Sequence, residues 1–278
     1  MKQGFEDMVT LIRPHKGWKS IDLKELFKYK DLLYFLTVRG IKAKYAQSVL
    51  GVSWAVIQPL FSTLVFTIVF GNLAKVSSEG VPYFLFSLVA LVPWLYFANT
   101  LTDASSSLVA NAPMISKVYF PRLVLPLSAA FSKILDFIIG MIMIFVFLAI
   151  YQVPLTSKVL LLPVLILVLL ITSLGLGMLF SAMSVQYRDI KHALTFIVQL
   201  LMYAAPVVYP TSNIPVQYQL WYALNPMVGV IEGFRAALLE TQEFPTAWFL
   251  VGSGVSLIIF LLGAFYFRRM EKSFADVI

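Results

Sequence analysis

Residues 158–183 read KVLLLPVLILVLLITSLGLGMLFSAM, and the only charged residue among them is Lys158, at the first position. A helix rises about 1.5 Å per residue, so about 20 apolar residues cross a hydrocarbon core that is about 30 Å thick. The run is continuous and lacks the alternation of a transmembrane β-strand. A helix also satisfies its own backbone polar groups in lipid. The stretch therefore predicts a membrane-spanning helix.

Five further stretches have the same apolar character and a similar length. The whole chain agrees with them, because 60% of its 278 residues are hydrophobic and only 13% are charged, whereas soluble domains have roughly 25% charged residues. We therefore predict an all-α polytopic membrane protein with six transmembrane helices. The six spans are residues 54–74, 81–101, 125–150, 158–183, 193–210 and 246–267.

Positive charge is concentrated on one side of these spans. Ten of the 21 Lys and Arg residues lie in 1–53, and others lie in 102–124, in 184–192 and after residue 267. The opposite loops carry only Lys75, Lys158 and Arg235. The positive-inside rule then places both termini in the cytoplasm, and an even number of spans also requires the two ends on one side. We predict a multi-pass protein of a bacterial inner (plasma) membrane, and we attribute the formal charge of +7 to topology rather than to nucleic-acid binding.

The chain divides into an arm, a transmembrane domain and a tail. Residues 1–53 form the arm, in which Asp22 and Glu25 have the spacing of a capping box. The arm is rich in lysine and aromatic residues and is too polar to cross a membrane, so we expect an amphipathic helix at the interface, with an ordinary surface helix as the alternative. Residues 54–268 form the six-helix transmembrane domain. In it, residues 211–240 are divided by prolines and predict short re-entrant helices on the outer side. Residues 269–278 are a cytoplasmic tail.

Catalytic motifs are missing from the sequence. There is no Gly-x-x-x-x-Gly-Lys-Ser/Thr phosphate loop, no cysteine, and only two histidines, His15 and His192. We expect no metal site, no cofactor bound by this chain and no enzymatic activity of its own. A membrane glycosyl- or phosphotransferase, the alternative from another class, would need convergent carboxylates or a histidine pair.

Lys133 and Asp136 are opposite charges within one predicted span, and their spacing of three places them on one helix face. A charge near the bilayer centre costs about 2.5–3.5 kcal/mol on insertion scales, so we expect an intramembrane polar pair that faces the bundle or a transport path. The alternative is that Lys133 reaches the nearby headgroups with its long side chain.

Several motifs, in this order and spacing, resemble those of type-2 ABC transporter permeases that export polysaccharides, the O-antigen and teichoic acid export group. The motifs are residues 31–45, Ser48-Val-Leu-Gly-Val-Ser-Trp54, Gln58-Pro59, Val92-Pro-Trp94, Ser184-Val-Gln-Tyr-Arg-Asp189, Tyr209-Pro210, Asn225-Pro226 and Gly233-Phe-Arg-Ala236. The resemblance extends from about residue 20 to the tail.

The resemblance implies a homodimer of permeases with two copies of a separate cytoplasmic ATPase subunit, which binds ATP and Mg²⁺. It also implies a coupling helix that docks on the ATPase, here Gln186, Tyr187, Arg188, Asp189, Ile190 and Lys191. The alternative for these residues is a solvated turn. The resemblance further implies outer gate helices, to which we assign Tyr209, Pro210, Tyr218, Trp221 and Tyr222.

The substrate implied by the resemblance is a polysaccharide linked to a polyprenyl diphosphate lipid. Its diphosphate needs cations at the headgroup level, and Arg39, Lys42 and Lys44 precede the first span. These cations could instead enforce topology or bind anionic membrane lipids. We predict a permease subunit of an ATP-driven exporter of O-antigen, teichoic acid or capsule, with a permease for a drug or small lipid as the alternative.

Overall fold

The computed structural model describes residues 23–46, 48–240, 243–272 and 274, and the predicted cap residue Asp22 lies outside them. Helices make up the described chain, without any strand among these residues. They are α1 (Leu23–Lys28), α2 (Lys30–Tyr45), α3 (Trp54–Phe66), α4 (Tyr83–Ala110), α5 (Ala112–Ile115), α6 (Val124–Ser132), α7 (Ile134–Ile150), α8 (Leu162–Gln186), α9 (Ile190–Tyr203), α10 (Val216–Tyr222), α11 (Pro226–Leu238) and α12 (Thr246–Met270). The other helical segments are the 3-10 helices η1 (Gly51–Ser53), η3 (Ser157–Leu161) and η4 (Thr211–Asn213) and the π-helix η2 (Thr67–Leu73).

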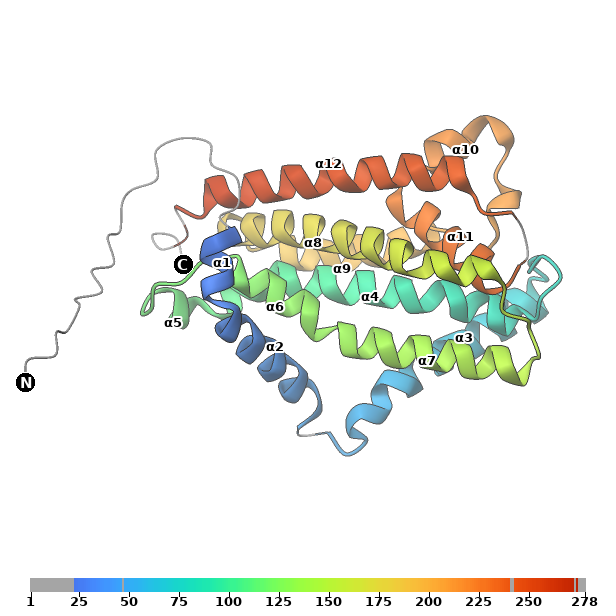
Figure 1. Cartoon of the computed structure of the whole chain (residues 1–278), viewed down its shortest axis with the longest axis horizontal. Coiled ribbons are helices and arrows are strands. Elements are labelled where there is room, and N and C mark those ends of the chain that lie inside the picture. The colour runs from blue at the N-terminus through green and yellow to red at the C-terminus, as the bar shows by residue number, and fades with distance from the viewer. Residues whose placement is uncertain (1–22, 47, 241–242, 273, 275–278) are drawn as a thin grey trace, which may run out of the picture.

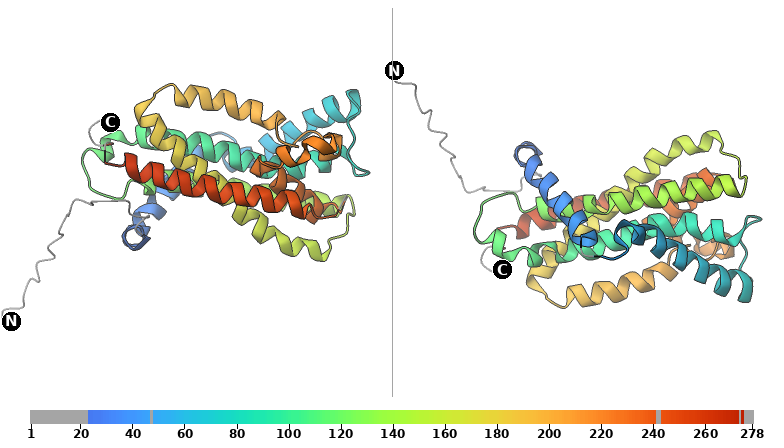
Figure 2. Two further views of the ribbon diagram at one scale, coloured as in Figure 1. Left: turned by 90° about the horizontal axis from the view of Figure 1, so that it is seen from above. Right: turned by 90° about the horizontal axis from the view of Figure 1, so that it is seen from below.

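Five helical segments of the described chain are long and apolar enough to cross a membrane. They are Gly51–Leu73, Tyr83–Ala110, Val124–Ile150, Ser157–Gln186 and Thr246–Met270. These segments confirm the all-α polytopic fold and five of the six predicted spans. They run side by side along the long axis of the molecule (Figures 1 and 2).

The sixth predicted span, 193–210, is helical only as far as Tyr203, so α9 has 14 residues and is too short to cross alone. The physical reason is Pro206, because a proline lacks the backbone N–H and its ring clashes with the carbonyl four residues earlier. Residues 204–210 continue as turns and bends instead of helix.

The helix α4 is the centre of the bundle. It packs against α3, α6, α7, α8, α9 and α11, and 78% of its most apolar window is buried, compared with 17% for the segment Gly51–Leu73. This helix also runs on through Ala110, so much of the expected loop 102–124 is helical. Only α5 and the turns between residues 116 and 123 form the connection to α6.

Two glycines bring α8 and α12 together. A Cβ atom built on Gly263 would lie 2.1 Å from the carbonyl oxygen of Gly175, and one on Gly175 would lie 2.7 Å from Cα of Phe260. Only glycine permits this approach, because small residues let the backbones of membrane helices come close together. By contrast, a Cβ on Gly254 would meet open space.

The described part of the arm is packed on the bundle. The helix α2 lies along α6, where Leu36 is buried and a Cβ on Gly40 would lie 3.2 Å from that of Ser132. Phe27 and Phe35 point outward and are well exposed. A helix is therefore confirmed in the arm, while its position at the membrane interface stays a prediction.

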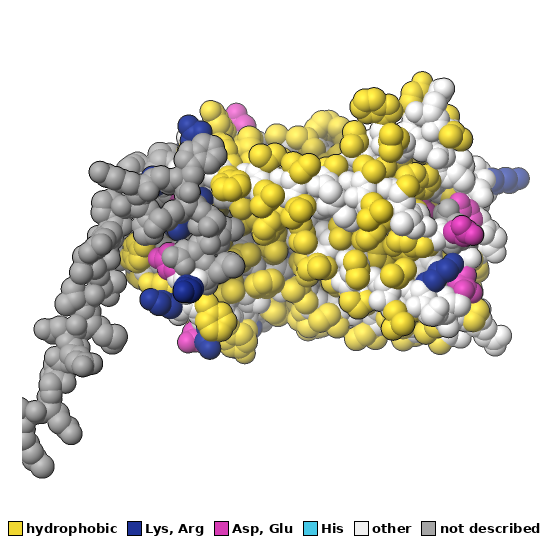
Figure 3. Space-filling view, turned by 45° about the horizontal axis from the view of Figure 1, so that its top comes forward, with side chains coloured by type: hydrophobic (Ala, Val, Ile, Leu, Met, Phe, Trp, Pro, Cys, Tyr) yellow, Lys and Arg dark blue, Asp and Glu magenta, His cyan; other side chains and the backbone are white. Residues whose placement is uncertain are grey.

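The two ends of the bundle differ in what they carry (Figure 1). The arm helices, α5, the α8–α9 turn and the end of α12 lie at one end, which we call the arm end. The helices α10 and α11 lie at the other, which we call the gate end. Figure 3 shows a broad apolar band between the two ends, with charged side chains gathered beyond it at both.

Candidate functional site: two polar clusters in an apolar bundle

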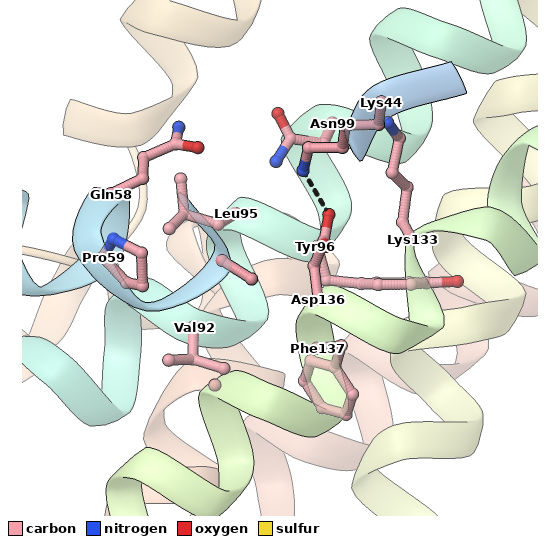
Figure 4. Close-up of a pocket in the computed structure, with 12 residues that line it drawn as sticks. Lys44, Gln58, Pro59, Val92, Leu95, Tyr96, Asn99, Lys133, Asp136 and Phe137 are labelled. Carbon is pink, nitrogen blue, oxygen red and sulfur yellow. Dashed lines mark hydrogen bonds and ion pairs between the residues drawn. The ribbon is translucent and has the colours of Figure 1, made fainter. Parts of the chain in front are cut away.

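The first polar cluster lies toward the arm end, where α2, α3, α4 and α7 meet around a small cavity (Figure 4). The cavity has a volume of about 30 Å³, enough for about one water molecule. Its polar lining comes from Lys44, Gln58, Asn99, Lys133 and Asp136, with Tyr96 beside them. We call this group the arm cluster.

Asp136 joins α7 to the end of α2. Its carboxylate accepts a hydrogen bond from Lys44 Nζ at 2.5 Å, the dashed contact in Figure 4, and another from the Tyr45 hydroxyl. Burial and the neighbouring carboxylate raise the pKa of Tyr45. Tyr45 therefore keeps its proton at neutral pH and remains a donor to Asp136.

The predicted pair of Lys133 and Asp136 is wrong as a pair. Lys133 instead forms an ion pair with Asp103 of α4. The helix breaks at Lys133, whose amide bonds to the Ala130 carbonyl three residues back at 3.1 Å, in the manner of a 3-10 turn. Lys133 thus lies at the junction between α6 and α7 and Asp136 lies on α7, and each has its ion-pair partner on another helix.

The three cations that the sequence suggested for a diphosphate site differ in their contacts. Arg39 donates to Asn111 Oδ1 at 2.6 Å, and Lys44 is engaged by Asp136. Lys42 is exposed on the last turn of α2. The structure therefore keeps all three at the arm end, with two of them in contact with the bundle.

The second polar cluster lies at the gate end and is completely buried. Arg235 and Glu232, both on α11, form an ion pair of 2.8 Å in which the side chains are 0% and 1% exposed. The guanidinium also donates to the Val207 carbonyl at 3.0 Å and to those of Tyr209 and Phe86 at 3.4 Å. Its Cζ atom lies 3.5 Å from the centre of the Phe86 ring. We call this group the gate cluster.

The gate cluster satisfies the backbone that α9 leaves free when it ends. The Arg235 guanidinium donates hydrogen bonds to the Val207 and Tyr209 carbonyl groups. The Tyr83 hydroxyl donates to the Val208 carbonyl at 2.5 Å, and the Asn225 amide donates to that of Ala204 at 3.3 Å. Non-helical backbone is tolerated at membrane depth only where protein covers it and supplies such partners. Side chains of α4 and α11 therefore replace the hydrogen bonds of a missing last turn.

The predicted gate residues are spread around this cluster. The Tyr209 and Tyr222 hydroxyls lie 3.0 Å apart, and Tyr209 also donates to the Tyr203 carbonyl at 2.8 Å. Burial, followed by the contact with Tyr209, raises the pKa of Tyr222. Pro210 is buried, whereas Tyr218 and Trp221 are exposed on α10. Two short helices, α10 and α11, occupy the predicted range 211–240.

Sequence reasoning missed the gate cluster because it treated Arg235 as a charge in an outer loop. The available signal was a Glu and an Arg three residues apart in the otherwise apolar run Glu232-Gly-Phe-Arg-Ala-Ala-Leu238. A pair at this spacing lies on one face of a helix, and a buried pair of this kind indicates protein contacts rather than solvent.

The predicted coupling helix 186–191 is not a separate helix. Gln186 is the last residue of α8, and Tyr187 adopts an extended conformation that ends the helix. Ile190 then begins α9. The side chains of Tyr187, Arg188 and Asp189 are exposed in this tight turn at the arm end. Within the described residues, no group of three or more acidic, His or Cys side chains could hold a metal ion.

The all-helical fold agrees with the comparisons to known proteins. Residues 31–239 match the ABC-2 type transporter family, and this chain belongs to that family. The chain is 31% identical over 260 residues to the O-antigen export system permease protein RfbA of Myxococcus xanthus, an alignment that covers 92% of this chain and 98% of that protein. It is 29% identical to the protein of the same name from Klebsiella pneumoniae, over 93% and 100% of the two chains. It is 24% identical to the polysialic acid transport protein KpsM of Escherichia coli, over 86% and 93%.

Proposed function

We propose that this chain is the membrane-spanning subunit of an ATP-driven exporter, and that its cargo is a polysaccharide of the O-antigen type carried on a polyprenyl diphosphate lipid. The observation that carries the proposal is the family match together with relatives that are named for O-antigen and polysialic acid export. The relatives align over almost their whole length, so they support the function of a complete permease.

A separate ATPase subunit follows from the same proposal. The 278-residue sequence contains no phosphate-loop motif, so the energy must come from another chain. The exposed turn that contains Arg188 and Asp189 is the surface that we assign to this partner. It joins α8 and α9 directly, so a push on the turn is passed to both helices as a rigid-body motion.

The exposed surface of α9 supports a homodimer. Only Leu194 and Val198 of this helix are buried, while Thr195 and Gln199 are exposed on one adjacent face. Polar side chains that face lipid are unfavourable, so this face fits a second copy of the chain or a polar path between two copies. The arm end, where Lys and Arg gather, would then face the cytoplasm together with both termini of the chain.

The cations of α2 support a site for the lipid diphosphate at the arm end. Arg39, Lys42 and Lys44 lie on the last two turns of α2, at the level where a lipid-linked sugar would leave the cytoplasmic leaflet. In this proposal Lys42 attracts the diphosphate first, and Lys44 exchanges its Asp136 partner for a phosphate oxygen. At the other end, Tyr218 and Trp221 of α10 would meet the glycan as it emerges.

The proposal is tested by purifying the tagged chain from the membranes of its own host and identifying the proteins that elute with it. We expect a stoichiometric subunit with a phosphate-loop motif, and we expect loss of surface polysaccharide when the lysine of that motif is changed. A homomer without an ATPase would defeat the proposal. In the same assay, Arg188→Ala with Asp189→Ala should release the partner, whereas the matched control Lys158→Ala at the gate end should not.

A further inference from the structure

A second and much larger cavity opens in the side of the bundle between α4, α8 and α9, under α10 and the start of α11. Its volume is about 390 Å³, within the range of about 300–1,000 Å³ for ligand pockets. Four aromatic side chains line it, Trp94 and Phe97 from α4 and Trp221 and Tyr222 from α10. No residue of the arm cluster lines it.

The cavity reaches the middle of the bilayer. Trp94 and Phe97 lie near the middle of the 28-residue helix α4, and Thr172 and Leu176 lie near the middle of the 25-residue helix α8. A helix that spans the hydrocarbon core has its midpoint near the bilayer centre. The cavity thus extends from the level of α10 down to a depth where lipid tails, rather than water, surround the protein.

The cavity has an accessible mouth and a buried floor. Trp221 is 73% exposed at the mouth, and Ala204 beside it is also exposed. On the floor, Trp94 and Phe97 are each 3% exposed and Met227 is 1% exposed. Trp94 lines the cavity but has almost no accessible surface, so lipid that only surrounds the bundle does not contact it, and an occupant of the cavity meets it at a small area.

The polar side chains of the lining are already engaged within the protein. The Thr172 hydroxyl bonds to the Val168 carbonyl at 2.8 Å and to the Ser256 hydroxyl at 2.7 Å. The Tyr222 hydroxyl is held by Tyr209. The Asn225 amide donates to the Ala204 carbonyl and accepts from the Met227 amide.

The lining also includes the indole side chains of Trp94 and Trp221, and an indole N–H can donate but cannot accept. A sugar would lose its hydrogen bonds to water here and find few replacements, at a cost in free energy for each unpaired group. An apolar chain leaves no polar group unpaired on entry and fills space between largely apolar side chains.

We propose that this cavity binds the hydrocarbon chain of a membrane lipid, inserted from the side of the bundle with its end at Trp94. The chain would fill the space between α9 and α4 and would separate these helices below α10. The proposal concerns a site that shares no residue with the proposed diphosphate site and shares only Trp221 with the proposed glycan path.

The test uses tryptophan fluorescence, because the sequence has only five tryptophans. In the full chain, Trp18, Trp54, Trp221 and Trp248 are replaced by phenylalanine, which leaves Trp94 alone. The protein is reconstituted in vesicles of phosphatidylcholine whose acyl chains carry bromine, a quencher that acts at contact. We expect Trp94 to lose most of its fluorescence relative to vesicles of unbrominated lipid, and to be insensitive to acrylamide in the water.

Two control variants give the quenching expected at full lipid contact and at no lipid contact. Each is made in a chain in which all five tryptophans, Trp94 included, are replaced by phenylalanine. Leu257→Trp, on the 52% exposed face of α12, should be quenched by the surrounding lipid, and Phe234→Trp, at 0% exposure away from the cavity, should not. Filling the cavity with Leu176→Phe and Ala204→Phe should protect Trp94 severalfold. If either filling variant fails to fold, the other, or the unfilled chain with the two calibration variants, still decides the result.

Two outcomes would overturn the proposal. Trp94 that behaves like Phe234→Trp would mean that no chain enters. Quenching of Trp94 by acrylamide, without quenching by brominated lipid, would mean a water-filled cavity suited to a glycan. Adding a polyprenyl phosphate to the brominated vesicles then distinguishes the source of the chain, because recovery of fluorescence identifies the isoprenoid as the preferred occupant and no recovery identifies the phospholipid acyl chain.

Discussion

The gate cluster and the arm cluster both bury charge inside an apolar bundle, but they connect different things. In the gate cluster, Arg235 and Glu232 belong to one helix, have at most 1% exposure, and hold the backbone of 204–210. In the arm cluster, Lys44 with Asp136 and Lys133 with Asp103 join separate helices, and their side chains are between 12% and 48% exposed.

The difference teaches which cluster is fixed and which can exchange partners. A fully buried pair cannot lose one member without leaving an uncompensated charge, which is strongly unfavourable. A partly exposed pair can separate with water as the replacement partner, so its net contribution to stability is small. We infer that the gate cluster fixes the structure of the gate end, whereas the arm cluster permits α2 to shift against α4 and α7.

The largest effect is expected for Arg235→Met. This change leaves Glu232 as a buried charge and removes the donors to three carbonyl groups, so we expect a loss of about 3–5 kcal/mol in the free energy of unfolding. The measurement is thermal or denaturant unfolding of the purified protein. Arg235→Lys keeps the charge but not the planar guanidinium, so its stability should lie between that of Arg235→Met and that of the original chain. Equal stability of Arg235→Met and the original chain would contradict a fixed gate cluster.

Glu232→Gln should have a smaller effect, about 2–3 kcal/mol, because Arg235 keeps its three carbonyl partners and its contact with Phe86. Unfolding of this variant and of the double variant with Arg235→Met completes a cycle. Since the two residues share one network, the double variant should lose less than the sum of the single losses. Strict additivity would show that the ion pair contributes little.

The sequence predicted the fold well because lipid imposes few solutions on a chain with this hydropathy. The long apolar runs correctly predicted five spans, and the spacing of the prolines predicted the short helices between Thr211 and Leu238. The break in the sixth span was also readable, since Pro206 cannot continue a helix. The break at Lys133 was not, since no proline or glycine marks it, and its ion-pair partner Asp103 is 30 positions away in the sequence.

The candidate sites were harder to predict than the fold. A helix that is apolar all round does not reveal which neighbour a charge meets, so the true partners of Asp136 could not be found from spacing alone. Residue types at both clusters were visible in the sequence, but Lys44 and Asp136 are 92 positions apart, with two complete spans and the start of a third between them. The roles of Arg39, Lys42 and Lys44 toward a diphosphate, and of the α8–α9 turn toward an ATPase, stay predictions.

Asp136→Asn should cost only about 1 kcal/mol in stability, since one third of the Lys44 side chain is exposed and solvent screens the pair. The expected change is in the mobility of α2, because both the Lys44 and Tyr45 contacts weaken. The chain has no cysteine, so a spin label on Tyr34→Cys, an exposed position of α2, reports this motion directly. Asp31→Asn, an exposed carboxylate on the same helix, is the control and should leave the spectrum unchanged.

The smallest effect is expected for the pair of Lys133 and Asp103. Asp103 is 48% exposed, so removing its charge by Asp103→Asn should change stability by less than about 1 kcal/mol. Lys133→Met should cost no more, because losing the cation leaves a carboxylate that water can reach. Exchanging the two charges, with Asp103→Lys and Lys133→Asp, should restore the stability of the original chain if the pair acts only through charge. A loss comparable to that of Arg235→Met would show that this pair is buried in the working transporter, for example beneath a second subunit, and the contrast between an exchangeable arm cluster and a fixed gate cluster would fail at this helix.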